Sequence, residues 1–266
     1  IAELSGLRQS IGDDIAQRSK AKRVTSDLHK ALEEGNFDAT ARILENRSEQ
    51  LIDVYPKSKS TLDKLRLDLN RRLETRLRET CRQLEEYCRS KRIPLAGKSP
   101  KYTVDHLLDV ECDRTKLRSK VGIQSLGTFE WPAVREALEH ERARLWQRPF
   151  KASEFRDQLL EAHRELVHQG GGGASWVGLE EIYQILKGQT QDADPNWQTG
   201  GRLVAYYKDE YSADLSRLWA AQAGKRVETP HVEFSAIRDP RRAFKIIQPD
   251  RNVGTYGFLR PREAVR

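Results

Sequence analysis

The segment TLDKLRLDLNRRLETRLRETCRQLEEYCRSKR, residues 61–92, predicts one long amphipathic helix. Helix breakers bound it, since Pro56 precedes it and Pro94 follows it. At about 100° per residue, the apolar side chains gather on one broad face and a row of cations lies on the opposite face. The apolar face comprises Leu65, Leu69, Leu73, Leu77, Cys81, Leu84, Tyr87 and Cys88. The opposite face, named the basic stripe, comprises Lys64, Arg71, Arg78, Arg82 and Arg89.

The basic stripe has two interpretations. A protein that neutralises several phosphates needs lysines and arginines on one surface, which the stripe supplies. Acidic residues flank the stripe, however, and would repel a phosphate backbone. Several of them precede an arginine by four positions, the spacing and order that stabilise an exposed helix. A solvated, self-paired face is therefore favoured, and nucleic-acid binding is the alternative. The expected pairs are Asp68–Arg72, Glu74–Arg78 and Glu85–Arg89.

The apolar face of this helix can pack inside the protein or against another chain. Two preceding helices over residues 7–53, with Gly35 as a C-terminal cap between them, offer an intramolecular partner. Strict heptad spacing is not kept, which favours this partner over a self-standing coiled coil. The alternative is a protein–protein interaction module, or a homodimer, that binds through Leu65, Leu69, Leu73, Leu77 and Leu84.

The rest of the first predicted domain, residues 1–148, contains a β-hairpin and a further helix. Apolar and polar residues alternate over 102–123, which predicts a hairpin with its turn at 113–116. Pro132 suits the first turn of a helix over 131–146.

The second predicted domain, residues 149–266, has three helices followed by short strands. Amphipathic stretches predict helices over 152–168, 179–186 and 206–223, with loops at 170–173 and 189–201. Strands are expected over 231–237 and 243–247, joined at 239–240, with a third short strand over 255–259. This element order resembles that of a winged helix-turn-helix domain. The predicted fold class is mainly α with small β-hairpins, an α+β protein with a winged-helix-like C-terminal unit.

The resemblance implies where a nucleic acid would bind. Arg238, Arg241 and Arg242 cluster at the tip of the expected hairpin, near Lys245, where a wing would meet a phosphate backbone or a minor groove. The third helix would read the groove. Only two of its polar positions are cations, which counts against sequence-specific recognition of bases. For the arginines at the hairpin tip, the alternative is that they only keep the protein soluble. The polar positions expected to be exposed are Lys208, Asp209, Ser212 and Arg217.

The bulk composition narrows the class of protein. The chain has 266 residues and a formal net charge of +7, with 33% charged and 37% hydrophobic residues. This composition is typical of long, surface-rich helices and is not polar enough for a disordered chain. No apolar run reaches the roughly 20 residues that cross a bilayer, and no signal peptide opens the sequence. Three cysteines without metal-type spacing make a reducing cytoplasm the expected location.

Catalytic and metal-binding patterns are weak throughout. His163 and His168 are five residues apart, which places them about 140° from each other around a helix, whereas the histidines of a zinc-binding pair are four apart and share one face. Asp109 and Glu111 share one face of a strand but lack the lysine companion of metal-dependent nucleases. Phosphate-binding loops and nucleophile elbows are missing from the sequence. No metal or cofactor is expected, and an enzyme with an unrecognised site is the least favoured class.

The leading hypothesis is therefore a non-enzymatic protein of a bacterial-type cytoplasm that binds nucleic acid or serves as an accessory subunit of a DNA-handling complex. It would bind through the basic C-terminal hairpin and use the long helix as a scaffold. A protein–protein interaction module without nucleic acid is the second hypothesis.

Overall fold

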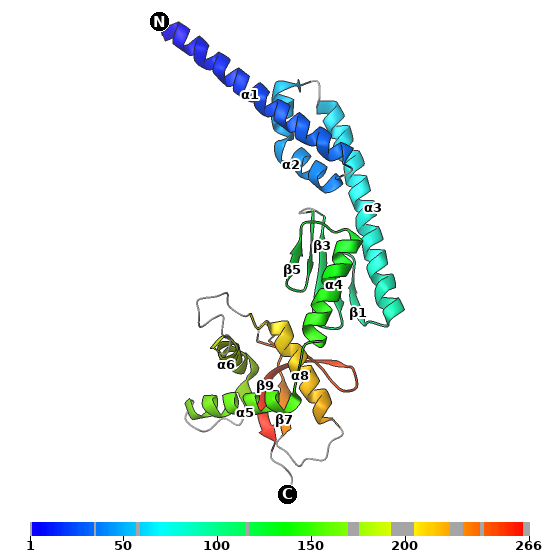
Figure 1. The fold of residues 1–266 in the computed structure, drawn as a ribbon, viewed down its shortest axis with the longest axis vertical. Helices are drawn as coiled ribbons and strands as arrows, with labels where there is room; N and C mark the ends of the chain where they lie inside the picture. The colour runs from blue at the N-terminus through cyan, green and yellow to red at the C-terminus, as the bar shows by residue number, and fades with distance from the viewer. Residues whose placement is uncertain are drawn as a thin grey trace. The chain divides into compact units, whose positions relative to one another are not determined.

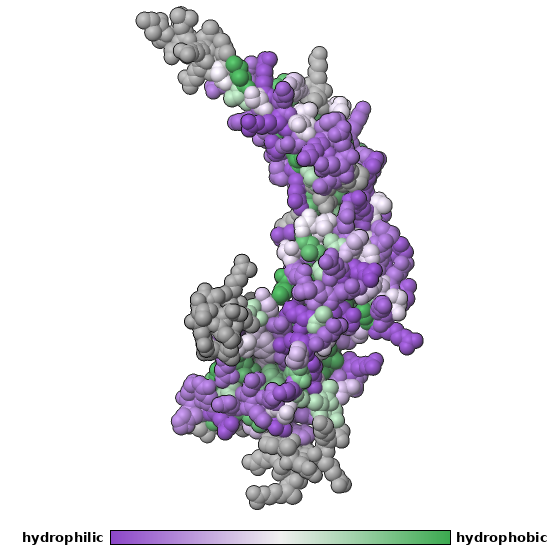
Figure 2. All heavy atoms as spheres, viewed as in Figure 1, coloured by the Kyte–Doolittle hydropathy of each residue, from purple (hydrophilic) through white to green (hydrophobic). Residues whose placement is uncertain are grey.

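A computed structural model describes residues 2–34, 36–56, 59–114, 117–169, 176–192, 205–223, 231–239 and 242–262 (Figure 1). Helices and antiparallel strands are both present, so the fold is mixed α+β. None of the helices in these ranges is both long and apolar enough to span a membrane. On the face shown in Figure 2, hydrophilic residues predominate and hydrophobic residues form small separate areas.

The chain divides into two compact units. Unit 1 contains Ile1–Lys91, Lys98–Tyr102 and Val110–Glu136. Unit 2 contains Arg92–Gly97, Thr103–Asp109 and Ala137–Arg266. The last change of unit along the chain follows Glu136, whereas the sequence placed the domain boundary at 148.

Unit 1 begins with three helices, α1 (Ala2–Glu33), α2 (Phe37–Val54) and α3 (Lys59–Lys91). The side chain of Asn36 caps α2 by accepting a hydrogen bond from the backbone N–H of Ala39 at 3.0 Å. Pro56 follows the end of α2, and Pro94 follows the end of α3. The predicted long helix over 61–92 is thus confirmed.

The apolar face of α3 packs inside unit 1. Leu69 and Leu73 are buried in one cluster with residues of α1, α2 and the following strands, and Leu65 and Leu77 are partly buried against the same cluster. Leu84 is only 1% exposed. The chain itself covers this face, as the favoured intramolecular packing predicted, and gives no support to the alternative that another subunit binds through Leu65, Leu69, Leu73, Leu77 and Leu84.

Five short strands follow α3 and form one sheet in the order β1-β2-β3-β4-β5. The predicted hairpin is confirmed where β3 pairs antiparallel with β4, in a register that joins Asp113 to Arg118. The sequence missed β1 and β5, and it placed Val104 and Leu108 on one strand. These two residues lie on separate strands because Asp105 and His106 adopt positive φ angles of 48° and 66° that reverse the chain. The strands are β1 (Leu95–Lys98), β2 (Lys101–Val104), β3 (Leu108–Asp113), β4 (Arg118–Val121) and β5 (Gln124–Leu126).

The sheet of unit 2 is built around its longest strand, β9 (Val253–Arg262), with which β6, β7 and β8 all pair. The predicted hairpin between 231–237 and 243–247 is wrong, because both of these strands pair antiparallel with β9. The hairpin of unit 2 is β8–β9, and β6 pairs with the far end of β9. The elements of this part of the chain are α4 (Trp131–Trp146), α5 (Ala152–Gln169), β6 (Val177–Gly178), α6 (Leu179–Asp192), α8 (Lys208–Gln222), β7 (His231–Ala236), β8 (Phe244–Ile247) and β9 (Val253–Arg262).

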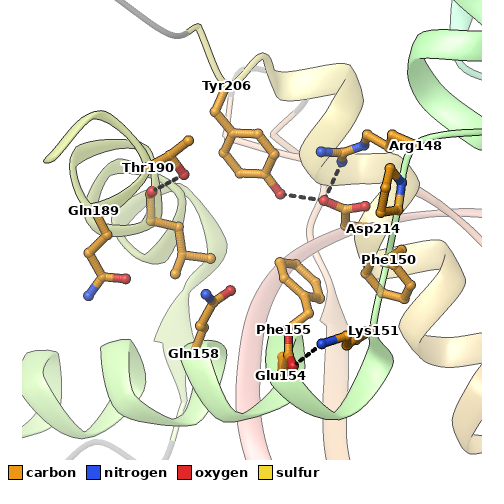
Figure 3. Close-up of a pocket in the computed structure, with 12 residues that line it drawn as sticks. Arg148, Phe150, Lys151, Glu154, Phe155, Gln158, Gln189, Thr190, Tyr206 and Asp214 are labelled. Atoms are coloured by element: carbon orange, nitrogen blue, oxygen red, sulfur yellow. Dashed lines mark hydrogen bonds and ion pairs between the residues drawn. The ribbon is translucent and has the colours of Figure 1, made fainter. Parts of the chain in front are cut away.

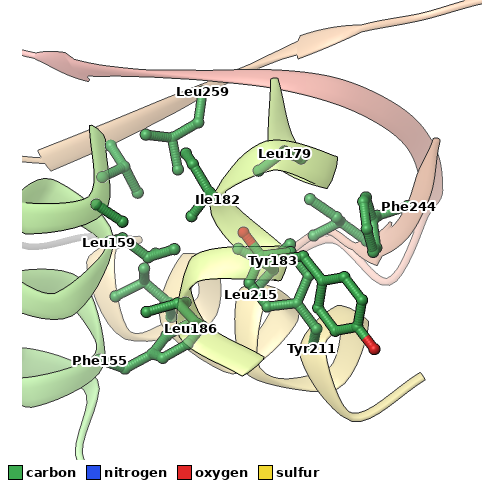
Figure 4. Packing of buried hydrophobic residues seen from close by; sticks show 14 of the residues in the cluster. Phe155, Leu159, Leu179, Ile182, Tyr183, Leu186, Tyr211, Leu215, Phe244 and Leu259 are labelled. Atoms are coloured by element: carbon green, nitrogen blue, oxygen red, sulfur yellow. The ribbon is translucent and has the colours of Figure 1, made fainter. Parts of the chain in front are cut away.

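An aromatic and aliphatic core fills unit 2 (Figure 4). Tyr211 lies at its centre, fully buried, with its ring centroid 5.0 Å from that of Phe244 and 5.4 Å from that of Tyr183. Such edge-to-face and tilted aromatic contacts add to the stabilisation from buried area. Leu159 of α5 and Leu215 of α8 complete the packing with 0% exposure.

Two leucines of α3 test the packing of this helix. Leu73 is 2% exposed, so Leu73→Ala leaves a cavity and should lower the free energy of unfolding by about 2–5 kcal/mol. Leu67 is 55% exposed on the same helix, so Leu67→Ala should change it by less than about 0.5 kcal/mol. Urea unfolding followed by circular dichroism measures both variants. Equal losses would contradict the described packing.

Candidate binding surfaces

Helix α8 is buried and is not an exposed groove reader. All residues from Glu210 to Ser216 are buried, including Ser212 at 5% exposure. The sequence expected Ser212 to be exposed, and that prediction is wrong because α8 packs against α5 on one side and against β8 on another. Ser216 shows the second contact, since its Oγ accepts a hydrogen bond from the backbone N–H of Ile247 at 2.9 Å.

One guanidinium group balances several carboxylates at the start of α8. Arg144 is paired with Glu141 at 2.8 Å, with Glu210 at 3.2 Å and with Asp209. Burial acts to lower the pKa of Arg144, but the hydrogen bonds and charges of Asp209 and Glu141 outweigh it and raise this pKa above its ordinary value. Asp209 is thus held in a network within the protein rather than presented to a ligand.

Arg217 lies in a second network of the same kind. Its guanidinium donates to the backbone oxygen of Arg148 at 3.1 Å, stands 3.8 Å from Asp214 and stacks 4.3 Å from the ring centroid of Phe150. Arg148 and the hydroxyl of Tyr206 both donate to Asp214 Oδ2. Arg217, predicted to contact nucleic acid, is therefore half-buried and paired with an acid.

A cavity of about 420 Å³ lies beside this second network (Figure 3). Tyr206 and Arg148 point at Asp214 at one end, and Lys151 pairs with Glu154 at 2.7 Å at another. Burial raises the pKa of Asp214, against the opposing effects of Arg148, Tyr206 and Arg217. A carboxyl with a raised pKa in a cavity is a candidate acid.

The contacts of Asp214 make it a structural group instead. Its Oδ2 is taken up by two donors, and its Oδ1 is buried at 3.8 Å from Arg217. In the part of the chain that the structure describes, no group of three or more His, Cys, Asp and Glu side chains could hold a metal ion. The cavity is therefore lined by paired charges and by side-chain amides, and its described lining residues do not form a recognisable catalytic arrangement.

The remaining predicted cations of unit 2 lie around β7 and β8. Arg238 and Lys245 are exposed and form no ion pair with any described residue. Arg242 pairs with Glu181 at 2.6 Å, and Lys208 pairs with Glu180 at 2.5 Å. Arg241 lies outside the described residues.

Strand register brings Arg238 and Lys245 to one part of the sheet. The backbone N–H of Ile237 donates to the backbone oxygen of Thr255 on one edge of β9. On the other edge, Lys245 of β8 lies opposite Thr255 in the strand register. Neighbouring strands are about 4.8 Å apart, so Ile237 and Lys245 lie about 10 Å apart. The sequence placed the hairpin tip near Arg238, but the turn of the observed hairpin contains Arg251 instead, which has a φ of 68° and is exposed. No sequence signal distinguished Arg251 from other surface arginines.

The basic stripe of α3 is exposed and partly neutralised. Arg78 pairs with Glu74 at 2.9 Å, and Arg82 pairs with Glu79 at 2.6 Å and with Glu86. Lys64, Arg71 and Arg89 form no ion pair within the described ranges.

Two of the three predicted pairs along α3 are confirmed. These are Glu74–Arg78 and Asp68–Arg72, the second at 2.8 Å. Glu85 accepts a hydrogen bond from the hydroxyl of Tyr102 at 2.6 Å instead of pairing with Arg89. Helical spacing alone could not predict this contact, because Tyr102 lies on strand β2.

The chain matches no protein-family model, no curated protein and no solved structure.

The Arg144 network can be tested by a substitution. Arg144→Gln leaves the carboxylates of Glu141, Asp209 and Glu210 without their cation, so it should lower the free energy of unfolding by about 3–5 kcal/mol. Arg78→Gln, which breaks an exposed pair on α3, should leave stability nearly unchanged. Denaturant unfolding of the two variants checks this, and a stable Arg144→Gln protein would contradict the role given to the network.

Proposed function

We propose that unit 2 is a winged-helix-like module that contacts a nucleic-acid backbone through the β8–β9 hairpin, in a protein without catalytic activity of its own. The observation that carries the proposal is a set of exposed cations, two on this hairpin and one just after β7. Arg238, Lys245 and Arg251 form no ion pair with the rest of the described chain. The other predicted cations of unit 2 in the described ranges, Arg242, Lys208 and Arg217, are each paired with an acid.

The order of elements supports the winged-helix comparison. Helix α5 is followed by the short strand β6, which pairs with β9, and α6 and α8 precede β7. The sheet order is β6-β9-β7, so the strand between the first two helices joins the strands that follow the third helix. Burial of α8 removes the helix that would read bases, which leaves contacts to phosphates and sugars. Binding would therefore be independent of sequence.

The charge at the hairpin limits the strength of this binding. Three cations neutralise at most three phosphates, and each neutralised phosphate contributes about −0.9 to the slope of log affinity against log salt for duplex DNA. Asp239 and Asp250 lie in the same connections and oppose a polyanion. A slope of about −2 to −3 is expected, together with weak affinity suited to a subunit held near DNA by other proteins.

Salt-dependent binding to a duplex tests the proposal. Fluorescence anisotropy with a labelled duplex of about 20 base pairs, from about 50 to 300 mM salt, should give this slope with no preference among sequences. The triple variant Arg238→Gln, Lys245→Gln, Arg251→Gln should abolish binding because it removes the three cations of the proposed surface.

A matched control separates the hairpin from the basic stripe. The triple variant Lys64→Gln, Arg71→Gln, Arg89→Gln removes the same charge from α3 and should bind as the unchanged protein does. Absence of binding at low salt, or loss of binding only in the α3 variant, would refute the proposed surface.

A further inference from the structure

A groove of about 850 Å³ runs along one face of α1 in unit 1. Leu51 and Tyr55, at the end of α2, and Leu62, at the start of α3, form its other wall. Most of the α1 residues in it recur every three or four positions, the spacing of a single helix face. From the first to the last of them the groove extends about 21 Å, at about 1.5 Å per residue. The α1 residues are Ile15, Arg18, Ser19, Lys22, Thr25, Ser26, Leu28 and His29.

The groove combines buried leucines with two exposed large hydrophobic residues. Leu28, Leu51 and Leu62 are 8%, 6% and 6% exposed, so they form a packed floor. Ile15 and Tyr55 are 59% and 52% exposed, which is high for large hydrophobic side chains. Single exposed hydrophobic residues need no explanation, but these two border one groove. The groove therefore offers apolar anchor points to a partner.

The helix that carries the groove extends beyond its neighbours in unit 1. Residues 12–20 of α1 are exposed at every position, so no described residue covers this end of the groove. Small side chains at Ser19 and Ser26 allow another backbone to approach closely. Thr25 directs its hydroxyl to the backbone oxygen of Ala21 at 3.0 Å, which satisfies that polar group without a partner. An α-helix of about four turns matches the length of such a groove.

The charges along the groove indicate which charge a bound helix should carry. The groove lining includes Arg18 and Lys22 and no carboxylate. Arg18 pairs with Asp14 at 3.0 Å, whereas Lys22 forms no ion pair with residues that the structure describes. An acidic occupant would complement this face. A second copy of α1 would bring its own Arg18 and Lys22 against the same cations, which like-charge repulsion disfavours.

We propose that this groove binds an acidic amphipathic helix of another protein. Apolar residues spaced at i, i+3 or i+4, and i+7 would fill the positions bordered by Ile15 and Tyr55, and a carboxylate beside them would pair with Lys22. This interaction is independent of the nucleic-acid contact, because it uses only residues of unit 1.

Selection from a peptide library tests the proposal on the full chain. Displayed random peptides of about 16 residues, long enough to cover four helical turns, are selected against the protein. Enriched sequences should show helical apolar spacing with flanking Asp or Glu. A labelled synthetic copy of the best sequence then serves as the probe in anisotropy titrations, and circular dichroism should show that it gains helix on binding.

Three variants locate the site. Ile15→Glu should weaken peptide binding by about tenfold or more, because it places a charge at an apolar anchor. Lys22→Glu should also weaken it, and changing the facing acid of the peptide to Lys should restore binding to this variant. Leu67→Glu is the control, since Leu67 on α3 is 55% exposed, close to the 59% of Ile15, but does not line the groove. All three sites are on the surface, and unchanged thermal unfolding verifies their folds.

Several outcomes would overturn the proposal. These are the enrichment of basic or non-helical peptides, binding that Ile15→Glu leaves unchanged, and failure to enrich any peptide. A concentration-dependent dimer that Ile15→Glu abolishes in sedimentation equilibrium would assign the groove to a second copy of the chain.

Discussion

The pairing of Arg144 with the carboxylates of Glu141, Asp209 and Glu210 is the constraint on which unit 2 depends. Charged and hydroxyl groups are costly to bury unless they are paired. This network, with Arg148 and Arg217 around Asp214, allows α8 to lie inside the unit while carrying Asp209, Glu210 and Asp214. Helix α8 is enclosed. Among the described residues near the sheet of unit 2, the cations without an ion pair are Arg238 and, on the β8–β9 hairpin, Lys245 and Arg251. The proposed nucleic-acid contact therefore remains on a hairpin, but this hairpin is β8–β9 and not the one expected between 231–237 and 243–247.

Helical periodicity in the sequence predicted the structure more reliably than strand patterns did. The repeated apolar face bounded by prolines predicted the long helix α3. This apolar face is buried inside the protein, as its departure from strict heptad spacing predicted. The strand pairing of unit 2 could not be predicted in the same way. Ser235 and Lys245 lie near each other in sequence, yet both β7 and β8 pair with the later strand β9. The long strand Val253–Arg262 accepts both of them, and its length was not evident from alternation.

The exposure of α8 was mispredicted for a related reason. Its polar residues look like a solvent face until their partners are known, and Arg144 and Arg148 come from more than 60 positions earlier in the chain. The groove along α1 was missed because its apolar residues are separated in sequence. Ile15, Tyr55 and Leu62 belong to three elements, and none of them alone marks a binding site. Contacts made over long sequence separations decide both surfaces, so local pattern could not supply them.

Amide hydrogen exchange of unit 2, with and without duplex DNA at low salt, tests the central claim most directly. Buried, paired segments exchange slowly. The account predicts that the amides of residues 210–218 are among the slowest in the unit and do not change when DNA is added. It predicts added protection at residues 244–256. Fast exchange in α8, or DNA-dependent protection of α8 without any change in the hairpin, would contradict it.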